Sequence, residues 1–467
     1  MRDPIALALR SAVALGVISL SGCSFVPPLE RPAPPVAAQW PQPYSPAGAR
    51  SVAGLDWRQF LPDPRLQALV TASLDNNRDL RIAIARVEEA RALYGIVRAD
   101  RLPTLNATGS LGASRTPADV STTGRALVAR RYDLALSFTA FELDFWGRVK
   151  SLDQAALATY LATDEARQAF RLSLIADVAN AYLTFEEMQE RTALAQETVK
   201  NRAEIRELVM KRRDAGLAGD LDYLAADGAY QSSRADLASL ERSRAAAENA
   251  LVLLVGTMPD RLPAPRALFE AGIVPDLTVD VPSETLLRRP DVRAAEQKLV
   301  AANANIGAAR AAFLPRIGIG LGAGLASPTL SSLFDAGSGA WSFTPSLVQP
   351  LFDSGRNQAN LDLAQVRKVI AVADYERTIQ QAFREIADSL AARDTLAGQI
   401  EAQEAAQRSQ DDRLRIVDAR YRAGASSYLE VLDAQRDAYA ARQATVQVRR
   451  AFLSSAVQLY KALGGGQ

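Results

Sequence analysis

The chain has 467 residues, of which 48% are hydrophobic but only 6% aromatic, and its 54 basic residues nearly balance its 53 acidic ones. That balance gives no reason to expect nucleic-acid binding, which depends on a basic face that neutralises phosphates. Because the chain has no histidine and a single cysteine, a Cys/His metal site and an intrachain disulfide are excluded. An enzyme that uses only carboxylates stays possible. We expect neither enzyme activity nor a cofactor.

The N-terminus has the pattern of a lipoprotein signal peptide over residues 1–22. Arg2 and Arg10 precede an apolar run of about ten residues, which is the length of a signal-peptide core and too short to span a bilayer. The run ends in LSGC, which resembles the bacterial lipobox, so we predict that Cys23 is the lipidated first residue of the mature chain. Ser24 after it suggests the outer membrane. The alternative is an ordinary secretion signal with a chance cysteine.

Residues 23–65 form a proline-rich segment that follows the predicted anchor. Its composition favours an extended chain that packs along a surface rather than a core. No later segment reaches about 18 uncharged apolar residues, so any crossing of a membrane must be made by strands.

The remaining chain is written twice. The stretch 76–105 resembles 288–317, and DFWGR at 144–148 resembles FDSGR at 352–356. This internal repeat predicts two copies of one structural unit.

In each copy a helical pattern gives way to alternating polarity, at about 104–143 and about 316–351. LNATGSLGA with YDLALSFTA, and IGIGLGAGL with WSFTPSL, each predict a β-hairpin with strands of about ten residues, enough to cross a bilayer at a tilt. A soluble hairpin that caps a helical bundle is the alternative. Four strands cannot close a barrel and eight would leave a filled interior, whereas twelve from a homotrimer would leave a lumen.

Each hairpin is followed by a long helical pattern. It runs for roughly 65 residues, from near 146 to 213 and from near 353 to 421, and a second helix of roughly 35 residues follows a glycine. The helix before each hairpin should have about 30 residues. We therefore predict a mainly α fold with a long antiparallel α-helical barrel and a membrane β-barrel; a cytosolic coiled coil is the alternative. The predicted boundaries are repeat 1 at 66–256 with a tip at 214–220, an equatorial connector at 257–282, and repeat 2 at 283–467 with a tip at 422–427.

Several long motifs resemble one known family. LDWRQFLPDPRLQALV, LFDSGR, YRAGASSYLEVLDAQR and LYKALGGG are similar to the TolC family of outer-membrane factors, in its OprM-like lipoprotein branch. The resemblance implies a homotrimeric channel in outer-membrane lipid, with a periplasmic helical tunnel. It also implies two partners, a periplasmic adaptor (membrane fusion protein) and an inner-membrane transporter of the resistance-nodulation-division type. The chain would then be a passive exit duct for drugs or other small toxic compounds.

The resemblance also assigns roles at the predicted tips. It implies that Gly216, Leu217, Gly424 and Ala425 contact the adaptor. The plainer interpretation is that the two glycines only cap helices, where glycine tolerates a positive φ.

Four further residues are predicted to form a periplasmic gate. The family places acidic residues at Glu430 and Asp433 in lumen-facing rings that favour cations, and it places a closing latch at Asp222 and Tyr421. Some relatives have an arginine where this chain has Ser426, so the latch would be weaker here. The alternative is a solvated helix face with two acids three residues apart.

Two other functions remain open from the sequence. One is the outer-membrane duct of a type I protein secretion system, and the other is a lipid-tethered periplasmic coiled-coil scaffold. The sequence does not show which compounds are exported.

Overall fold

The computed structural model describes residues 24–41, 50–51, 55–264, 266, 273, 277–278 and 286–465. The predicted signal peptide and the lipidation site Cys23 lie outside the described residues, as does much of the connector at 257–282. The chain divides into two compact units. Unit 1 contains residues 1–32, 87–163 and 294–375, and unit 2 contains residues 33–86, 164–293 and 376–467.

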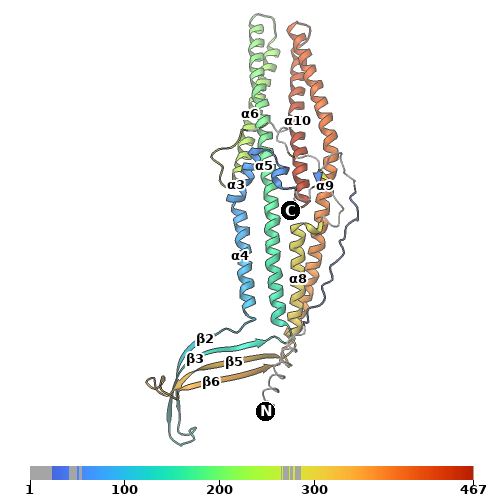
Figure 1. Ribbon diagram of the computed structural model, residues 1–467. Coiled ribbons are helices and arrows are strands. Elements are labelled where there is room, and N and C mark those ends of the chain that lie inside the picture. The colour runs from blue at the N-terminus through green and yellow to red at the C-terminus, as the bar shows by residue number, and fades with distance from the viewer. Residues whose placement is uncertain are drawn as a thin grey trace. The chain divides into compact units, whose positions relative to one another are not determined.

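Helices and strands follow one another in an order that occurs twice (Figure 1). The helices are α2 (Trp57–Phe60), α3 (Pro64–Asn76), α4 (Arg78–Ala99), α5 (Arg148–Asp214), α6 (Asp220–Val255), α8 (Pro290–Ala311), α9 (Arg356–Arg422) and α10 (Tyr428–Ala462). The strands are β1 (Arg50–Ser51), β2 (Asn106–Thr116), β3 (Leu127–Leu143), β4 (Leu277–Thr278), β5 (Arg316–Ser327) and β6 (Gly339–Val348). In the part of the chain that the structure describes, no helix combines the length and apolar content needed to cross a membrane.

The helix before each hairpin is shorter than predicted. Both α4 and α8 have 22 residues instead of about 30. In the first repeat the pattern is interrupted at Asn77, whose extended backbone ends α3. The Asn77 side chain accepts a hydrogen bond from the Leu80 amide at 2.9 Å and donates one to the Leu254 carbonyl at 2.9 Å. Asparagine therefore caps α4 and starts a new helix.

The two hairpins join in unit 1 as one antiparallel sheet, with strand order β2-β3-β5-β6. The register places one apolar side chain opposite another: Leu111 faces Tyr132, Leu134 faces Leu325 and Ala323 faces Trp341. Because side chains alternate along each strand, the sheet has one apolar face. Its members are Leu111, Tyr132, Leu134, Leu136, Phe138, Leu321, Leu325, Trp341, Phe343 and Leu347.

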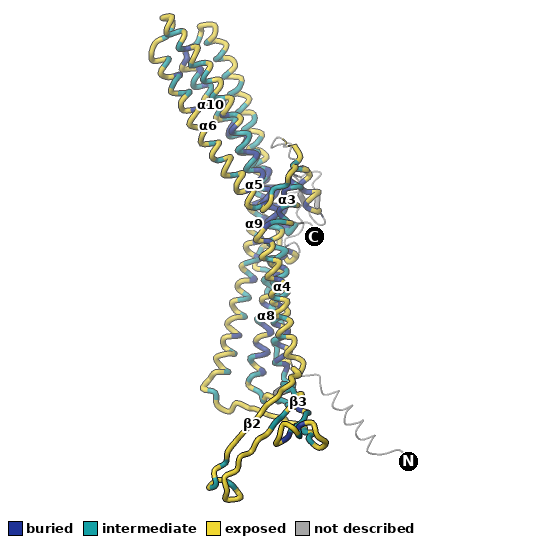
Figure 2. The backbone as a smooth tube through the Cα atoms, turned by 90° about the vertical axis from the view of Figure 1, so that its left-hand side faces the viewer, coloured by how far each residue is buried: buried dark blue, intermediate teal, exposed yellow. Residues whose placement is uncertain are grey.

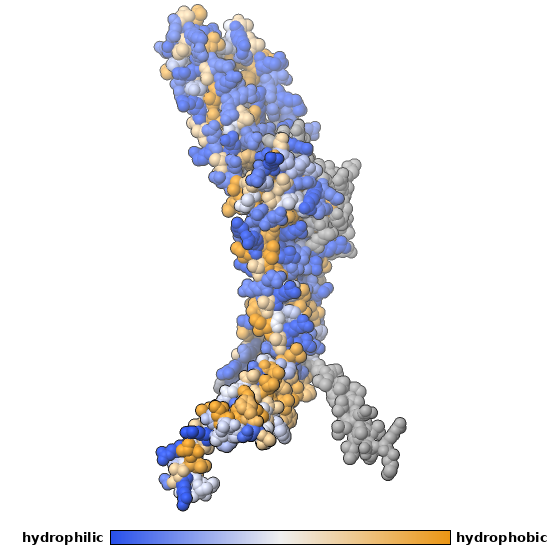
Figure 3. All heavy atoms as spheres, turned by 60° about the vertical axis from the view of Figure 1, so that its left-hand side comes forward, coloured by the Kyte–Doolittle hydropathy of each residue, from blue (hydrophilic) through white to orange (hydrophobic). Residues whose placement is uncertain are grey.

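The opposite face of the sheet carries small and polar side chains, among them Ser137, Gly322 and Ser342. At Gly324, a Cβ would overlap the Leu134 carbonyl oxygen, so only glycine fits. The apolar face is exposed in the single chain, with Trp341 80% exposed, and hydrophobic side chains gather over the strands in Figure 3.

The N-terminal strap, residues 24–31, packs on α8 in unit 1. The Asn303 amide donates to the Pro27 carbonyl at 2.8 Å, and Arg31 forms an ion pair with Glu296 at 2.8 Å. The strap passes so close to Gly307 that a Cβ there would overlap a methyl carbon of Val26. The first described residues of the predicted extended segment therefore pack at a defined position on α8.

The core of unit 2 forms where α3 meets α5 and α10. Leu66, Tyr182 and Leu459 are fully buried, and Phe60 stacks on Tyr460 with ring centroids 4.2 Å apart. Buried residues gather beside α3 and α5 in Figure 2. The buried Tyr182 hydroxyl donates to the Asp63 carboxylate at 3.0 Å, which satisfies two polar groups inside this core.

Candidate functional site at the helix tips

The first tip is a helix C-cap centred on Gly216. This glycine has φ 71°, and its N–H donates to the Arg213 carbonyl at 2.8 Å. The N–H of Leu217 donates to the Arg212 carbonyl at 2.8 Å. This pair of bonds is the Schellman motif, in which a left-handed residue ends a helix. The side chain of Leu217 is 71% exposed.

The second tip repeats the motif at Gly424, which has φ 78°. Its N–H donates to the Tyr421 carbonyl at 3.0 Å, and the N–H of Ala425 donates to the Arg420 carbonyl at 2.8 Å. A Cβ at either glycine would meet nothing within 4 Å. The positive φ, rather than crowding, therefore explains why glycine stands at both tips.

The helices that follow the tips begin differently. Helix α6 has Gly219 at its N-cap with no side-chain hydrogen bond, whereas α10 has a capping box between Ser427 and Glu430. The Glu430 carboxylate also accepts from the Ser426 hydroxyl at 2.6 Å. Hydrogen bonds from Ser426 and then Ser427 lower the pKa of Glu430 below its ordinary value. In the single chain, this predicted gate residue therefore folds back over the tip.

The other two predicted gate acids lie on the helix surface, where Asp433 is partly exposed and Asp222 is exposed. Asp433 forms an ion pair with Arg436 at 3.5 Å. Asp222 is exposed in the first turn of α6 and, within the described part of the chain, forms no hydrogen bond or ion pair. Its carboxylate is therefore free to meet a group outside this chain.

The predicted gate residue Tyr421 belongs to an apolar cluster that joins the two tips of unit 2. The cluster contains buried Val209, Ala226, Tyr428 and Val431 from α5, α6 and α10. Tyr421 packs against it from α9, with its ring centroid 5.8 Å from that of Tyr428, and the Arg212 guanidinium lies 5.3 Å above the ring. Burial raises the pKa of Tyr428 to about 12. The structure thus places Tyr421 among α5 and α10 residues and does not bond it to Asp222.

Arginine and tyrosine side chains fasten α5 to α6 below the first tip. Arg206 pairs with Asp227 at 2.5 Å, and its guanidinium lies 5.8 Å from the ring centroid of Tyr223 and 5.5 Å from that of Tyr230. Arg213 lies 4.5 Å above Tyr223. We did not predict this network from the sequence. The sequence feature that could have indicated it is a spacing of seven residues, between the two arginines on α5 and between the two tyrosines on α6. Residues seven apart lie on the same face of a helix, two turns from each other.

The second pair of helices is held by ion pairs instead. Arg413 of α9 meets Asp437 of α10 at 2.7 Å, and Arg442 of α10 meets Asp411 of α9 at 2.9 Å. Both pairs are partly exposed to water, which screens the charges, so they contribute little to stability.

Exposed leucines lie at both tips. Leu221 is 80% exposed and Leu224 is 63% exposed on α6, and Leu429 at the second tip is 66% exposed. Together with Leu217 they offer apolar area that no described residue of this chain covers, which is the usual mark of a protein interaction surface.

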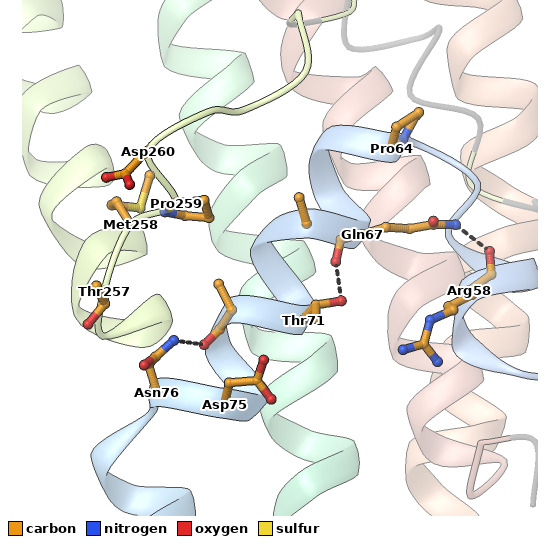
Figure 4. Close-up of a pocket in the computed structure, with 12 residues that line it drawn as sticks. Arg58, Pro64, Gln67, Thr71, Asp75, Asn76, Thr257, Met258, Pro259 and Asp260 are labelled. Carbon is orange, nitrogen blue, oxygen red and sulfur yellow. Dashed lines mark hydrogen bonds between the residues drawn. The ribbon is translucent and has the colours of Figure 1, made fainter.

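A hollow of about 690 Å³ lies between α3 and residues 257–260 in unit 2 (Figure 4). Two of its polar lining side chains bond to nearby backbone: Thr71 donates to the Gln67 carbonyl at 2.8 Å, and Asn76 donates to the Ala72 carbonyl at 2.9 Å. The described residues also contain no group of three or more possible metal ligands. These features do not indicate a catalytic or metal centre.

Comparisons with known proteins agree on one family. The family model described as outer membrane efflux protein matches residues 69–257 and 281–465. The outer membrane protein OprJ of Pseudomonas aeruginosa is 44% identical over 467 residues, which is 100% of this chain and 97% of OprJ. The toluene efflux pump outer membrane protein TtgC of Pseudomonas putida is 43% identical over 464 residues, covering 98% of this chain and 96% of TtgC. The crystal structure of the open state of the Neisseria gonorrhoeae MtrE outer membrane channel aligns with a TM-score of 0.86 at 38% identity, covering 95% of this chain and 98% of MtrE.

Proposed function

Because the chain belongs to the outer membrane efflux protein family, we propose that it is the outer-membrane exit duct of a tripartite efflux pump. The family consists of transport channels rather than enzymes. The observation that carries the proposal is the four-stranded sheet, whose apolar and polar faces suit lipid on one side and water on the other. The mainly helical fold with two hairpins is confirmed by the sequence and structural comparisons.

The duct closes as a homotrimer in this proposal. Strands β2 and β6 are the two edges of the sheet, and an unpaired edge is not tolerated in lipid. Three copies would supply twelve strands, the smallest closed set here that leaves a lumen. Cys23 would carry the lipid anchor, and the helices would extend into the periplasm.

The tips provide the contacts with the other pump components. The two C-caps expose Leu217 and the small residue Ala425, and Gly216 and Gly424 present bare backbone. These features support docking of a periplasmic adaptor, which links the duct to an inner-membrane transporter of the resistance-nodulation-division type. Tyr421, Asp222, Glu430 and Asp433 would close the duct through contacts between chains.

The cargo is proposed as drugs or other small toxic compounds. TtgC is named for toluene efflux, and the apolar solvent class belongs in the test for this reason. A strain that lacks the gene should become more susceptible to antibiotics or solvents, and plasmid-borne wild-type chain should restore resistance. A panel of antibiotics, solvents and metal salts reports the minimal inhibitory concentrations. If the deletion changed none of them but abolished secretion of a protein, the type I secretion function would replace this one.

A further inference from the structure

Two arginines stand at the loop end of the apolar sheet face. The register pairs Leu111 with Tyr132, and the next pair on the same face is Ala113 with Arg130. The pair after that brings Arg115 to this face from β2. Arg115 and Arg130 are therefore diagonal neighbours across β2 and β3, about 7–8 Å apart, and both are exposed.

The two guanidinium groups are unpaired within the part of the chain that the structure describes. Among the residues that the structure describes, neither Arg115 nor Arg130 forms an ion pair. Their neighbour Arg131 lies on the opposite, polar face, and its Nε donates to both oxygens of Asp133 at 2.8 and 3.0 Å. Of these two adjacent residues, Arg131 is neutralised by Asp133 on the polar face. Arg130 lies on the apolar face and has no ion pair in the described part of the chain.

At the loop ends of the two hairpins, basic residues occur only in the first. The turn between β2 and β3 contains Asp119 and Arg125, whereas the segment 328–338 between β5 and β6 contains Asp335 and no basic residue. Hydrophilic side chains gather beyond the hydrophobic strands in Figure 3. The loop end of each chain thus has one basic corner, on the outer surface of the first hairpin.

The following step rests on the proposed function, which places the apolar face against outer-membrane lipid. An arginine that faces lipid is costly at the midplane of the bilayer but costs little at the interface, and Tyr132 just below marks that interface. There the surrounding anions are lipid phosphates, and guanidinium binds phosphate through two parallel hydrogen bonds.

We propose that Arg115 and Arg130 bind the phosphorylated headgroup of an outer-leaflet lipid. Each chain contributes one such site, so that a trimer holds three. The site ties the channel to the outer leaflet, where the loop ends of the hairpins emerge.

The test uses full-length protein purified in detergent, with lipid A as the probe and native mass spectrometry as the measurement. Wild type should retain lipid A, and R115Q/R130Q should bind it at least about tenfold more weakly, because charge-assisted hydrogen bonds are lost. Lipid A without phosphates should bind wild type as weakly as lipid A binds the double variant. Millimolar inorganic phosphate should not compete, since the acyl chains hold the lipid at the apolar face; full competition would make the site one for free phosphate and overturn the lipid assignment.

Matched variants test whether lipid binding depends on these two arginines or on positive charge in general. R131Q changes the same charge one residue away on the opposite face and should leave lipid A retention unchanged, whereas R130K should give intermediate binding because it keeps the charge and loses the fork. If R131Q reduced retention as much as R130Q, general charge rather than this site would explain binding. If R115Q and D335N instead loosened the trimer equally without changing lipid retention, Asp335 of a second copy would be the partner and the inference would fail.

Failure of the inference can be told from failure of the proposed function. Channels that conduct in planar bilayers but retain no lipid A overturn the lipid site alone. A wild-type chain that neither conducts nor inserts overturns the exit-duct function, and the lipid site with it.

Discussion

Glu186 and Glu187 are adjacent on α5 and buried to a similar extent, yet their surroundings differ. Glu187 is 4% exposed and forms ion pairs with Arg191 at 3.0 Å and Arg450 at 2.7 Å. Glu186 is 5% exposed, and its Oε1 has no hydrogen-bond partner. Burial raises the pKa of Glu186 to about 7, against an opposing influence of Arg65. Glu187 is thus paired with two guanidinium groups, whereas burial favours the neutral form of Glu186.

Replacing Glu186 with Gln should change how stability depends on pH. The pKa of Glu186 is raised to about 7 in the folded chain, so the folded state binds this proton more tightly than the unfolded state does. The resulting stability is fully present at a pH below the ordinary carboxyl pKa. This stability is lost as the pH rises through about 7, since the folded state must then hold a buried anion. E186Q mimics the neutral acid, so its unfolding temperature should exceed that of wild type at about pH 8, and the gap should narrow at about pH 5.

Thermal unfolding in detergent at the two pH values measures the effect. E187Q is the matched control, because it removes the partner of two arginines and should destabilise by on the order of 2 kcal/mol at both pH values. Equal shifts of E186Q at both pH values would contradict the titration of Glu186.

The predicted gate can be tested at the same scale. In the single chain Tyr421 lies under Arg212 and beside Tyr428. The Asp222 carboxylate forms no hydrogen bond or ion pair with any residue that the structure describes, so a latch between Tyr421 and Asp222 must join different chains. If it does, Y421F with D222A removes charge-assisted hydrogen bonds of about 1.5–3 kcal/mol each, and single-channel conductance in planar bilayers should rise. Y230F with D236A is the control, because it makes the same two kinds of substitution on α6 at positions farther from the tip. This variant should conduct like wild type. Unchanged conductance of the first variant would remove Tyr421 and Asp222 from the gate.

Single residues mark the limit of what the sequence predicted. Gly216 and Gly424 were identifiable because a glycine between two helical patterns indicates a left-handed cap, and the structure has one at each. The sequence does not distinguish a Glu430 that faces the lumen in an acid ring from a Glu430 that caps its own helix. The spacing of Ser427 and Glu430 fits a capping box equally well, and only the backbone geometry decides which bonds form in one chain.

At the scale of elements, the strands were predicted from alternation but not their bulge. Between Phe138 and Phe141 the register of β3 against β5 shifts. After the shift, Phe141 pairs with Ile319 and Leu143 pairs with Ile317, so the apolar side chains return to the apolar face. Strict alternation would have turned them to the polar face. The pairing of β3 with β5 joins residues almost two hundred positions apart, which no local pattern specifies.

The N-terminal strap gives a prediction for a single element. Gly307 of α8 is a notch for Val26, and a Cβ there would also lie 2.9 Å from the Ser151 hydroxyl. G307A should therefore lower stability by about 1–3 kcal/mol, as overpacking does, and should free residues 24–31. Hydrogen exchange of those backbone amides, read by mass spectrometry, should speed up.

G95A is the matched control for the strap. Gly95 lies on α4 in the same unit, and a Cβ there meets nothing within 4 Å. Alanine should stabilise that helix by roughly 0.5–1 kcal/mol without changing exchange in the strap. Equal exchange in G307A and wild type would show that the strap does not depend on the notch.

At the scale of the whole molecule, the sheet cannot be complete in one chain. Strand β3 pairs on both sides, but β2 and β6 each pair on one side only within the described strands. The apolar face, including Trp341 and Phe343, is exposed as well. Both features call for further copies and for lipid, as the count of two hairpins per chain and the alternating polarity of their strands predicted from the sequence.

The number of copies follows from closing the sheet. Two chains would give eight strands, whose interior side chains would fill, and a duct needs more. Three chains give the smallest open lumen, and the glycines and serines of the polar face would line it. We therefore predict that tagged and untagged chains, expressed together and purified in detergent, will appear in native mass spectra as four mass species. Three species would indicate a dimer and five a tetramer, and either result would contradict closure by twelve strands and with it the trimer on which the gate depends.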